Sequence, residues 1–171
     1  MITNVFKCNM IVSNASTLIL LAKAGAIRIF LNEYGEISIP TEVEKEITEG
    51  KTFDSKILEK EIDDDHIIVK EIRSNTEKVM KEFKIHKGEA AAFILYKECN
   101  AKAILTDDGE LIKLCKLFEI PFINALAIIV RMFEKGSLTQ TEACEYLKKL
   151  NDYGRYSKEI YNYFKQEVNC P

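Results

Sequence analysis

The sequence predicts a three-layer α/β domain, in which a mostly parallel central sheet has helices on both faces and the carboxyl-terminal region is helical. The first observation is that short runs rich in β-branched residues alternate with longer helical patterns, an order typical of parallel sheets built through helical crossovers. The second is that capping and turn residues separate these runs. The third is that acidic side chains directly follow a buried apolar segment. Open α/β sheets bind their ligands at the carboxyl ends of such strands.

The first part of the chain alternates predicted strands and helices. Ser13-Asn14-Ala15-Ser16 ends the first strand with helix-capping residue types, and Gly25 closes the next helix. Pro40 ends the second strand and suits the first turn of a helix that stops at Gly50. The third strand alternates in polarity and is expected at a sheet edge. The predicted strands are 10–12, 36–39 and 66–72, and the predicted helices are 18–24, 27–31, 40–49, 56–62 and 76–83.

The second part repeats the pattern and then becomes entirely helical. Gly88 opens an apolar helix, and the helix that follows the next strand is amphipathic. Thr139-Gln140-Thr141-Glu142 is a capping box, and Ser157 caps the final helix. The predicted strands are 102–106 and 121–123, and the helices between them and before them are 88–99 and 109–118.

Length and composition fit a single domain with a sizeable core. The 171 residues are 47% hydrophobic and 30% charged, which is ordinary for a globular protein. We expect one domain over 1–171, with a core at about 9–150 and a helical extension at about 151–168. The net charge of −3 gives no global basic footprint, so a nucleic-acid ligand would have to use local lysines.

Cysteine usage and hydropathy predict a cytoplasmic protein that does not enter a membrane. The five cysteines are odd in number and form no Cys-x-x-Cys motif, so no disulfide scaffold is expected. Cys99, Cys115 and Cys144 are interpreted as small core residues. No basic-then-apolar signal segment is present, and the longest apolar run, 122–133, is too short to span a bilayer.

Adjacent carboxylates at Asp107 and Asp108 are the strongest chemical signal. They directly follow the predicted strand that ends in Ile104-Leu105-Thr106. Neighbouring carboxylates repel and raise each other's pKa, and a divalent cation relieves this by using them as oxygen ligands. Helix capping by an aspartate is the competing interpretation, and one acid would satisfy it.

Three other positions are candidates on weaker grounds. Glu89 begins a helix that is apolar almost all round, so its carboxylate is expected to face a crevice, although a first-turn acid also favours the helix dipole. Glu46 borders the apolar face of its helix, while Glu42 and Glu44 are expected to point elsewhere. Asn14 follows the first strand and is either an N-cap or a neutral oxygen ligand.

Other catalytic classes lack support in the sequence. Only two histidines occur, which makes a histidine-rich zinc site improbable. No nucleophile elbow, glycine-rich dinucleotide motif or P-loop is present. These absences leave no basis for a serine hydrolase or a nucleotide-dependent enzyme.

Taken in order and spacing, the motifs resemble the PIN-domain nuclease family, especially its small prokaryotic, toxin-type (VapC-like) branch. The resemblance covers roughly residues 9 to 150, with a gap over the charged stretch 51–80. The stretches that carry it are Val12-Ser13-Asn14-Ala15-Ser16-Thr17-Leu18-Ile19, Leu21-Ala22-Lys23, Ile39-Pro40 through Val43, Glu46 and Ile47, Gly88-Glu89-Ala90-Ala91-Ala92, Leu105-Thr106-Asp107-Asp108, and 122–138.

The resemblance implies a PIN-like, Rossmann-like fold and a ribonuclease that depends on Mg²⁺ or Mn²⁺. It places the acids at Asn14, Glu46, Glu89 and Asp107 or Asp108, and the Thr-x-Asp spacing favours Asp108 as the last ligand. Asn14 departs from the aspartate found in most of the family, which removes one negative charge from the site. Such enzymes leave a 5′-phosphate and a 3′-hydroxyl.

The resemblance also suggests contacts with RNA and with partner proteins. Ser16 is a candidate for contact with the phosphate, with helix capping as the alternative. The lysines proposed to guide the RNA backbone are Lys23, Lys84, Lys87 and Lys113. A toxin-type protein implies an antitoxin, and PIN-like toxins are usually dimers. We therefore expect a homo-oligomer in which 122–133 and the carboxyl-terminal aromatic residues supply apolar surface.

Two alternative interpretations stay open at this point. A catalytically degenerate PIN-like domain would act as a binding or assembly module. A receiver domain of the response-regulator type is also doubly wound and lined with acids, but it needs paired acids after its first strand and a lysine after its last. Here those positions hold Asn14 and Asn124.

Overall fold

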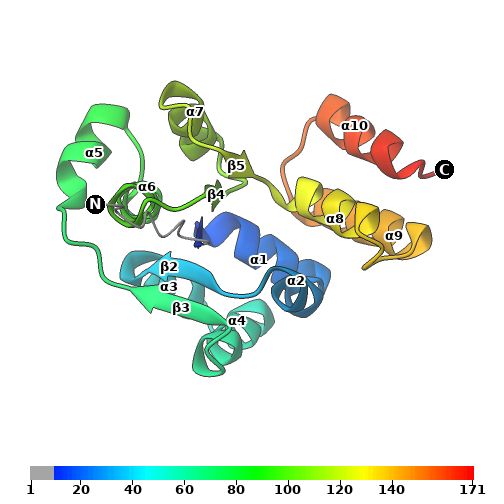
Figure 1. Ribbon diagram of the computed structural model, residues 1–171, viewed down its shortest axis with the longest axis horizontal. Helices are drawn as coiled ribbons and strands as arrows, with labels where there is room; N and C mark the ends of the chain where they lie inside the picture. Colours follow the sequence, from blue (N-terminus) through cyan, green and yellow to red (C-terminus); the bar gives the residue numbers. More distant parts are fainter. Residues whose placement is uncertain (1–9) are drawn as a thin grey trace, which may run out of the picture.

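The computed structural model describes residues 10–171, which form an α/β fold with one five-stranded parallel sheet (Figure 1). The sheet order is β3-β2-β1-β4-β5, so β3 is an edge strand, as predicted. Neighbouring strands run parallel throughout. The strands are β1 (Ile11–Ser13), β2 (Ile37–Pro40), β3 (Ile67–Lys70), β4 (Ala103–Leu105) and β5 (Phe122–Ile123).

The chain changes direction across the sheet between β1 and β4. It moves outward from β1 through β2 to β3, then returns to pair β4 with the free side of β1. Ser13 lies opposite Leu105, and the Asn14 amide donates to the Leu105 carbonyl at 2.9 Å. The prediction that these two strand ends are neighbours is confirmed. The strand order also differs from the 2-1-3-4-5 order of receiver domains.

Helices cover both faces of the sheet. One core cluster contains Leu18, Phe30 and Leu105, and the other contains Val12 and Ile104. The two clusters separate because successive side chains of a strand point to opposite faces. The helices are α1 (Ala15–Ala24), α2 (Ile27–Tyr34), α3 (Thr41–Thr48), α4 (Phe53–Asp63), α5 (Thr76–Phe83), α6 (Lys87–Cys99), α7 (Gly109–Leu117), α8 (Ala125–Glu134), α9 (Gln140–Tyr153) and α10 (Lys158–Val168).

Local sequence explains where the helices near the site begin and end. The Asn14 side chain accepts from the Ala15 amide and starts α1, and Gly25 ends that helix with a left-handed backbone at φ 79°. Asp108 caps α7 in the same way, through the Leu111 amide. The predicted capping box of α9 and the Ser157 cap of α10 are both present.

No single helix within residues 10–171 is long and apolar enough to cross a membrane. Helices α1 and α2 together have the necessary length and apolar composition, but the chain bends by 119° between them.

The carboxyl-terminal helices pack against one another and bury most of their apolar side chains. In α8 the apolar side chains are largely buried, and α8 packs against α9 and α10. The expectation that segment 122–133 would leave apolar surface for a dimer was therefore wrong, because the protein's own helices cover it. Tyr153, Ile160 and Tyr163 are the large apolar side chains that stay exposed in this region.

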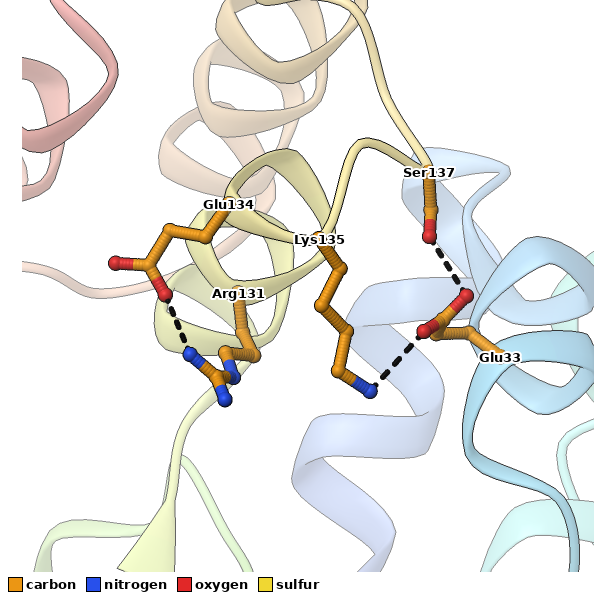
Figure 2. A network of polar contacts seen from close by, with 5 residues as sticks. All are labelled: Glu33, Arg131, Glu134, Lys135 and Ser137. Carbon is orange, nitrogen blue, oxygen red and sulfur yellow. Dashed lines mark hydrogen bonds and ion pairs between the residues drawn. The ribbon is translucent and has the colours of Figure 1, made fainter.

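A polar network fixes the α8–α9 connection on α2 (Figure 2). Glu33 of α2 accepts hydrogen bonds from Lys135 at 3.0 Å and from Ser137 at 2.6 Å. These two hydrogen bonds lower the pKa of the Glu33 carboxyl. Arg131, one helical turn before Lys135, pairs with Glu134. Exposure makes each ion pair weak, but Lys135 and Ser137 both attach the α8–α9 connection to one carboxylate of α2.

A disulfide joins Cys144 of α9 to Cys170, just beyond α10. The interpretation of Cys144 as a simple core residue was therefore wrong, whereas Cys115 is buried and free and Cys99 is half-buried and free. Sequence reasoning missed the pair because α9 and α10 pack side by side only in the folded chain. Cys8 lies outside the described residues.

Reduction of this disulfide should lower the stability of the protein. The cysteines are 26 residues apart, and a loop of that length corresponds to about 3.5 kcal/mol in the chain-entropy estimate. Thermal unfolding with and without reductant measures the effect, and we expect a fall of roughly 10 °C. A Cys144→Ser, Cys170→Ser variant that ignores reductant is the control. An unchanged wild-type transition would contradict the prediction.

Candidate functional site

Three carboxylates from different parts of the chain converge at the carboxyl ends of β1 and β4. Glu46 comes from α3, Glu89 from the first turn of α6, and Asp108 from the loop after β4. Desolvation raises the pKa of Glu46, and the negative charges of Glu89 and Asp108 raise it further. The pKa of Glu89 is likewise raised by desolvation and by Asp108. Mutual repulsion of this kind requires the carboxylates to be close neighbours.

Gly88 allows Glu46 and Asn14 to approach the start of α6. A Cβ atom at Gly88 would lie 2.6 Å from Glu46 Oε2 and 3.8 Å from Asn14 Oδ1. Asn14 is buried, with 2% of its surface exposed, and its Oδ1 accepts from the Ala15 amide at 2.8 Å. The structure therefore brings Asn14, Glu46, Glu89 and Asp108 together; we call this set the acid cluster.

Glu89 is the member of the acid cluster whose environment best fits a bound cation. The residue is only 8% exposed, and its Oε2 atom is buried without a hydrogen-bond partner. A buried carboxylate oxygen without a partner is costly, and a bound cation would remove that cost. Carboxylate and amide oxygens are also the donors that Mg²⁺ and Mn²⁺ prefer. The residues of the acid cluster therefore fit such a cation chemically.

Within residues 10–171, however, no three Asp, Glu, His or Cys side chains stand close enough together to enclose a metal ion. The carboxylates of the acid cluster therefore act on each other's charges without forming a closed set of ligands. Repulsion between like charges favours that spacing. Side-chain rotation would be needed to bring all of them onto one ion.

Two hollows flank the acid cluster. The first, which we call the Glu89 hollow, has a volume of about 570 Å³ and is lined by residues of α3 and of the start of α6, including Glu46 and Lys87. The second, the Tyr153 hollow, has a volume of about 560 Å³ and is lined by α1, the start of α7 and the segment between α9 and α10. Asp108 lines the Tyr153 hollow, and its negative charge also raises the pKa of Glu46 and Glu89 in the Glu89 hollow.

Asp107 occupies a different environment from Asp108. Its carboxylate accepts from Thr17 at 2.6 Å, from the Ala125 amide at 3.0 Å and from the Tyr156 hydroxyl. Burial raises the pKa of Asp107, although these hydrogen bonds oppose the shift. Burial and the Asp107 charge raise the pKa of Tyr156, so this hydroxyl stays protonated and donates. Asp107 thus joins α1, α8 and the carboxyl-terminal segment, while Asp108 faces the acid cluster.

Glu42 is the residue that the sequence interpretation placed wrongly. It was expected to point away from the site, but it lines the Glu89 hollow and its Oε2 atom is buried without a partner. A signal was available, because Glu42 precedes Glu46 by four residues and therefore shares its face of α3. Glu49 extends the same face into the hollow.

The candidate substrate-binding residues divide between the two hollows. Lys87 lines the Glu89 hollow, whereas Ser16 and Lys23 line the Tyr153 hollow. The Ser16 hydroxyl accepts from the Asp107 amide at 3.0 Å. Lys84 lines neither hollow, and Lys113 pairs with Glu110 on its own helix.

Replacing Glu89 by Gln should stabilise the metal-free protein at neutral and alkaline pH. The folded-state pKa of Glu89 is raised, so the folded protein favours the protonated carboxyl. The stability that this residue contributes is therefore present at low pH and is lost as the carboxyl ionises with rising pH. We expect a gain of about 1 kcal/mol near pH 8 that shrinks towards about pH 4.5. Urea unfolding in chelator measures it, with Glu44→Gln on α3 as the control. Equal or lower stability near pH 8 would contradict the prediction.

The fold and the site define a doubly wound α/β domain that gathers acids where the strand order reverses. A family model described as a PIN domain matches residues 10–169, and the chain belongs to the PIN-domain family. PIN domains are generally nucleases that use divalent metals, so this is a nuclease-type fold. No curated protein matches the chain.

Proposed function

We propose that the protein is a ribonuclease that depends on Mg²⁺ or Mn²⁺ and hydrolyses RNA phosphodiester bonds at the acid cluster. The observation that carries the proposal is the meeting of Glu46, Glu89 and Asp108 with Asn14 at the reversal point of the sheet. Acids from three separate helices and loops have no shared structural role there. Their mutual repulsion costs stability, which a function at the site would explain.

The donor set assigns a role to each residue. Glu89, Glu46 and Asp108 would hold the cation, with the Asn14 amide oxygen as a weaker fourth donor. A bound cation would supply an activated water and neutralise charge on the phosphate. The Asp108 Oδ1 atom is already held by the Leu111 amide at 2.8 Å, which fixes the direction of that carboxylate. Glu46 is exposed, so its carboxylate has room to turn towards a bound cation.

The wider role that we propose is that of a toxin restrained by an antitoxin protein. The net charge of −3 favours weak non-specific affinity for RNA, and therefore cleavage at selected sites rather than bulk degradation. We also propose a homodimer, in which the exposed Tyr163 of α10 offers apolar contact surface outside the Tyr153 hollow defined above. Light scattering that returns the monomer mass of 19.6 kDa at every concentration would contradict the dimer.

The test of the proposed function is cleavage of RNA by the purified protein. Single-stranded and structured RNA are incubated with Mn²⁺, with Mg²⁺ and with chelator. We expect cleavage only with metal, and products that carry a 5′-phosphate and a 3′-hydroxyl. Metal binding measured by calorimetry without any cleavage would favour a degenerate binding module, and the absence of both would refute the nuclease.

A further inference from the structure

We propose that the Tyr153 hollow holds a single-stranded segment of the RNA substrate beside the acid cluster. Tyr153 would stack on a base, and Lys23 and Arg155 would contact backbone phosphates. The inference rests on the proposed nuclease function and adds to it the route of the strand and residues that select it. The hollow lies against the acid cluster because Asp108 belongs to both.

The chemistry of the lining fits single-stranded nucleic acid. Tyr153 is 55% exposed although it is a large aromatic residue at the end of α9. Lys23 and Arg155 are exposed, and neither forms an ion pair with a carboxylate of residues 10–171. Aromatic platforms flanked by cations bind unpaired strands, because every base offers a π-face and every linkage a phosphate. Ile19 and Ile112 add apolar lining for a base.

The segment that supplies these residues is held firmly in place. Tyr156 donates to the buried carboxylate of Asp107, which Thr17 and the Ala125 amide also bind. Gly154 makes this path possible, since a Cβ there would lie 2.8 Å from the Leu150 carbonyl and would also meet the Tyr156 ring. The exposed Tyr153 and Arg155 therefore stand on either side of Gly154 at the edge of the hollow, next to a fixed point. Because this segment is already held in place, binding a strand would cost little conformational entropy in the protein.

Two carboxylates and two cations line the hollow, and their positions favour RNA as the occupant. Of the two carboxylates that line the hollow, Asp107 has its oxygens bound by hydrogen bonds, and Asp108 lies at the side of the acid cluster. The remaining charges are the cations Lys23 and Arg155. A polyanion with exposed flat bases uses both features at once, whereas duplex RNA buries its bases and cannot reach the Tyr153 ring.

Binding is tested with the full chain in chelator, so that the result does not depend on catalysis. The probe is a fluorescein-labelled oligouridine of about ten nucleotides, followed by anisotropy. We expect Tyr153→Ala to weaken binding roughly tenfold and Tyr153→Phe to retain it, because the ring does the stacking. Lys23→Gln and Arg155→Gln should each reduce the slope of log affinity against log salt by about 0.7. Phe53→Ala, an exposed aromatic residue of α4, and Lys149→Gln lie outside the hollow and are the matched controls.

A second measurement locates the strand directly. Oligouridine that carries 4-thiouridine is crosslinked by light, and the modified peptides are mapped. We expect crosslinks at residues 153–156 of the wild-type protein. Such crosslinks report contact with the strand itself, whereas weaker binding by a variant could also follow from a change in its structure.

The outcomes separate this inference from the nuclease proposal. Metal-dependent cleavage with unchanged binding in the Tyr153 and Arg155 variants, and crosslinks elsewhere, overturns the strand path and leaves the nuclease standing. Binding and crosslinks at 153–156 without cleavage supports the path and refutes the nuclease. A hollow that binds no RNA but is protected in a complex with a co-purified protein overturns the inference in favour of a protein partner.

Discussion

Glu89→Gln and Asp108→Asn are each expected to reduce metal-dependent RNA cleavage by about a thousandfold or more, since the cation supplies several kcal/mol of transition-state stabilisation. Both changes keep the size of the side chain and remove its charge. Asn is also a good helix N-cap, so Asp108→Asn retains the hydrogen bond that starts α7. The measurements are single-turnover cleavage with Mn²⁺ and calorimetric titration of the metal.

The pattern of losses distinguishes a metal site from a general structural effect. Glu44→Gln on α3 should leave cleavage and metal binding unchanged. Glu89→Gln should be the more stable protein in chelator and yet the inactive one, because the carboxylate that destabilises the free protein is the one that binds the ion. Loss of activity accompanied by a loss of stability in both variants would speak against the metal site.

Asn14→Asp is expected to tighten divalent-metal binding by roughly ten- to a hundredfold, because it adds a negative charge beside the acid cluster. Asp caps helices as well as Asn does, so the hydrogen bond to the Ala15 amide is retained. The added charge is buried next to Glu46, and we expect the metal-free protein to lose about 1–2 kcal/mol near pH 8. Saturating Mn²⁺ should restore that stability.

The control for this prediction is Asn14→Ala, which removes the cap and the oxygen donor without adding charge. It should lose about 1 kcal/mol without metal, and more with Mn²⁺, because the lost oxygen donor weakens the metal binding that stabilises the folded protein. Calorimetry and urea unfolding with and without Mn²⁺ distinguish the two variants. If Asn14→Asp binds Mn²⁺ no more tightly than wild type, Asn14 lies outside the metal's coordination sphere and acts only as the cap of α1.

Most elements of the fold were predictable because their signals are local. Helix α5 has the predicted bounds of residues 76 and 83, and the capping residues Asn14, Asp108 and Ser157 start helices in the structure. Boundaries elsewhere moved by one to a few residues; α1, for example, begins at Ala15 rather than at residue 18. Helix caps, glycines that end helices and alternating polarity each depend on residues close together in the chain, so they can be recognised from the sequence alone.

The members of the acid cluster were harder to judge from sequence. Asp108 and Glu89 follow a strand and open an apolar helix, and both positions suggest a crevice. Glu46 gave no such signal, because its role depends on α3 lying against the start of α6, where Gly88 leaves room for its carboxylate. Glu42 was misplaced for the same reason, since only the packing of α3 shows which face of that helix meets the hollow.

The sequence by itself determined the alternation of strands and helices, the helix caps and the family to which the chain belongs, because these depend on neighbouring residues and on motif order. Tertiary structure alone decided three further features. Asp107 pairs with Tyr156, 49 residues away, Cys144 joins Cys170, and the segment around Gly154 lines a hollow beside the acid cluster. Each depends on how α8 and α9 pack on α1 and how α10 packs on α8 and α9. That arrangement follows from burial of apolar faces, and an apolar face in the sequence indicates that it will be covered but not which element will cover it.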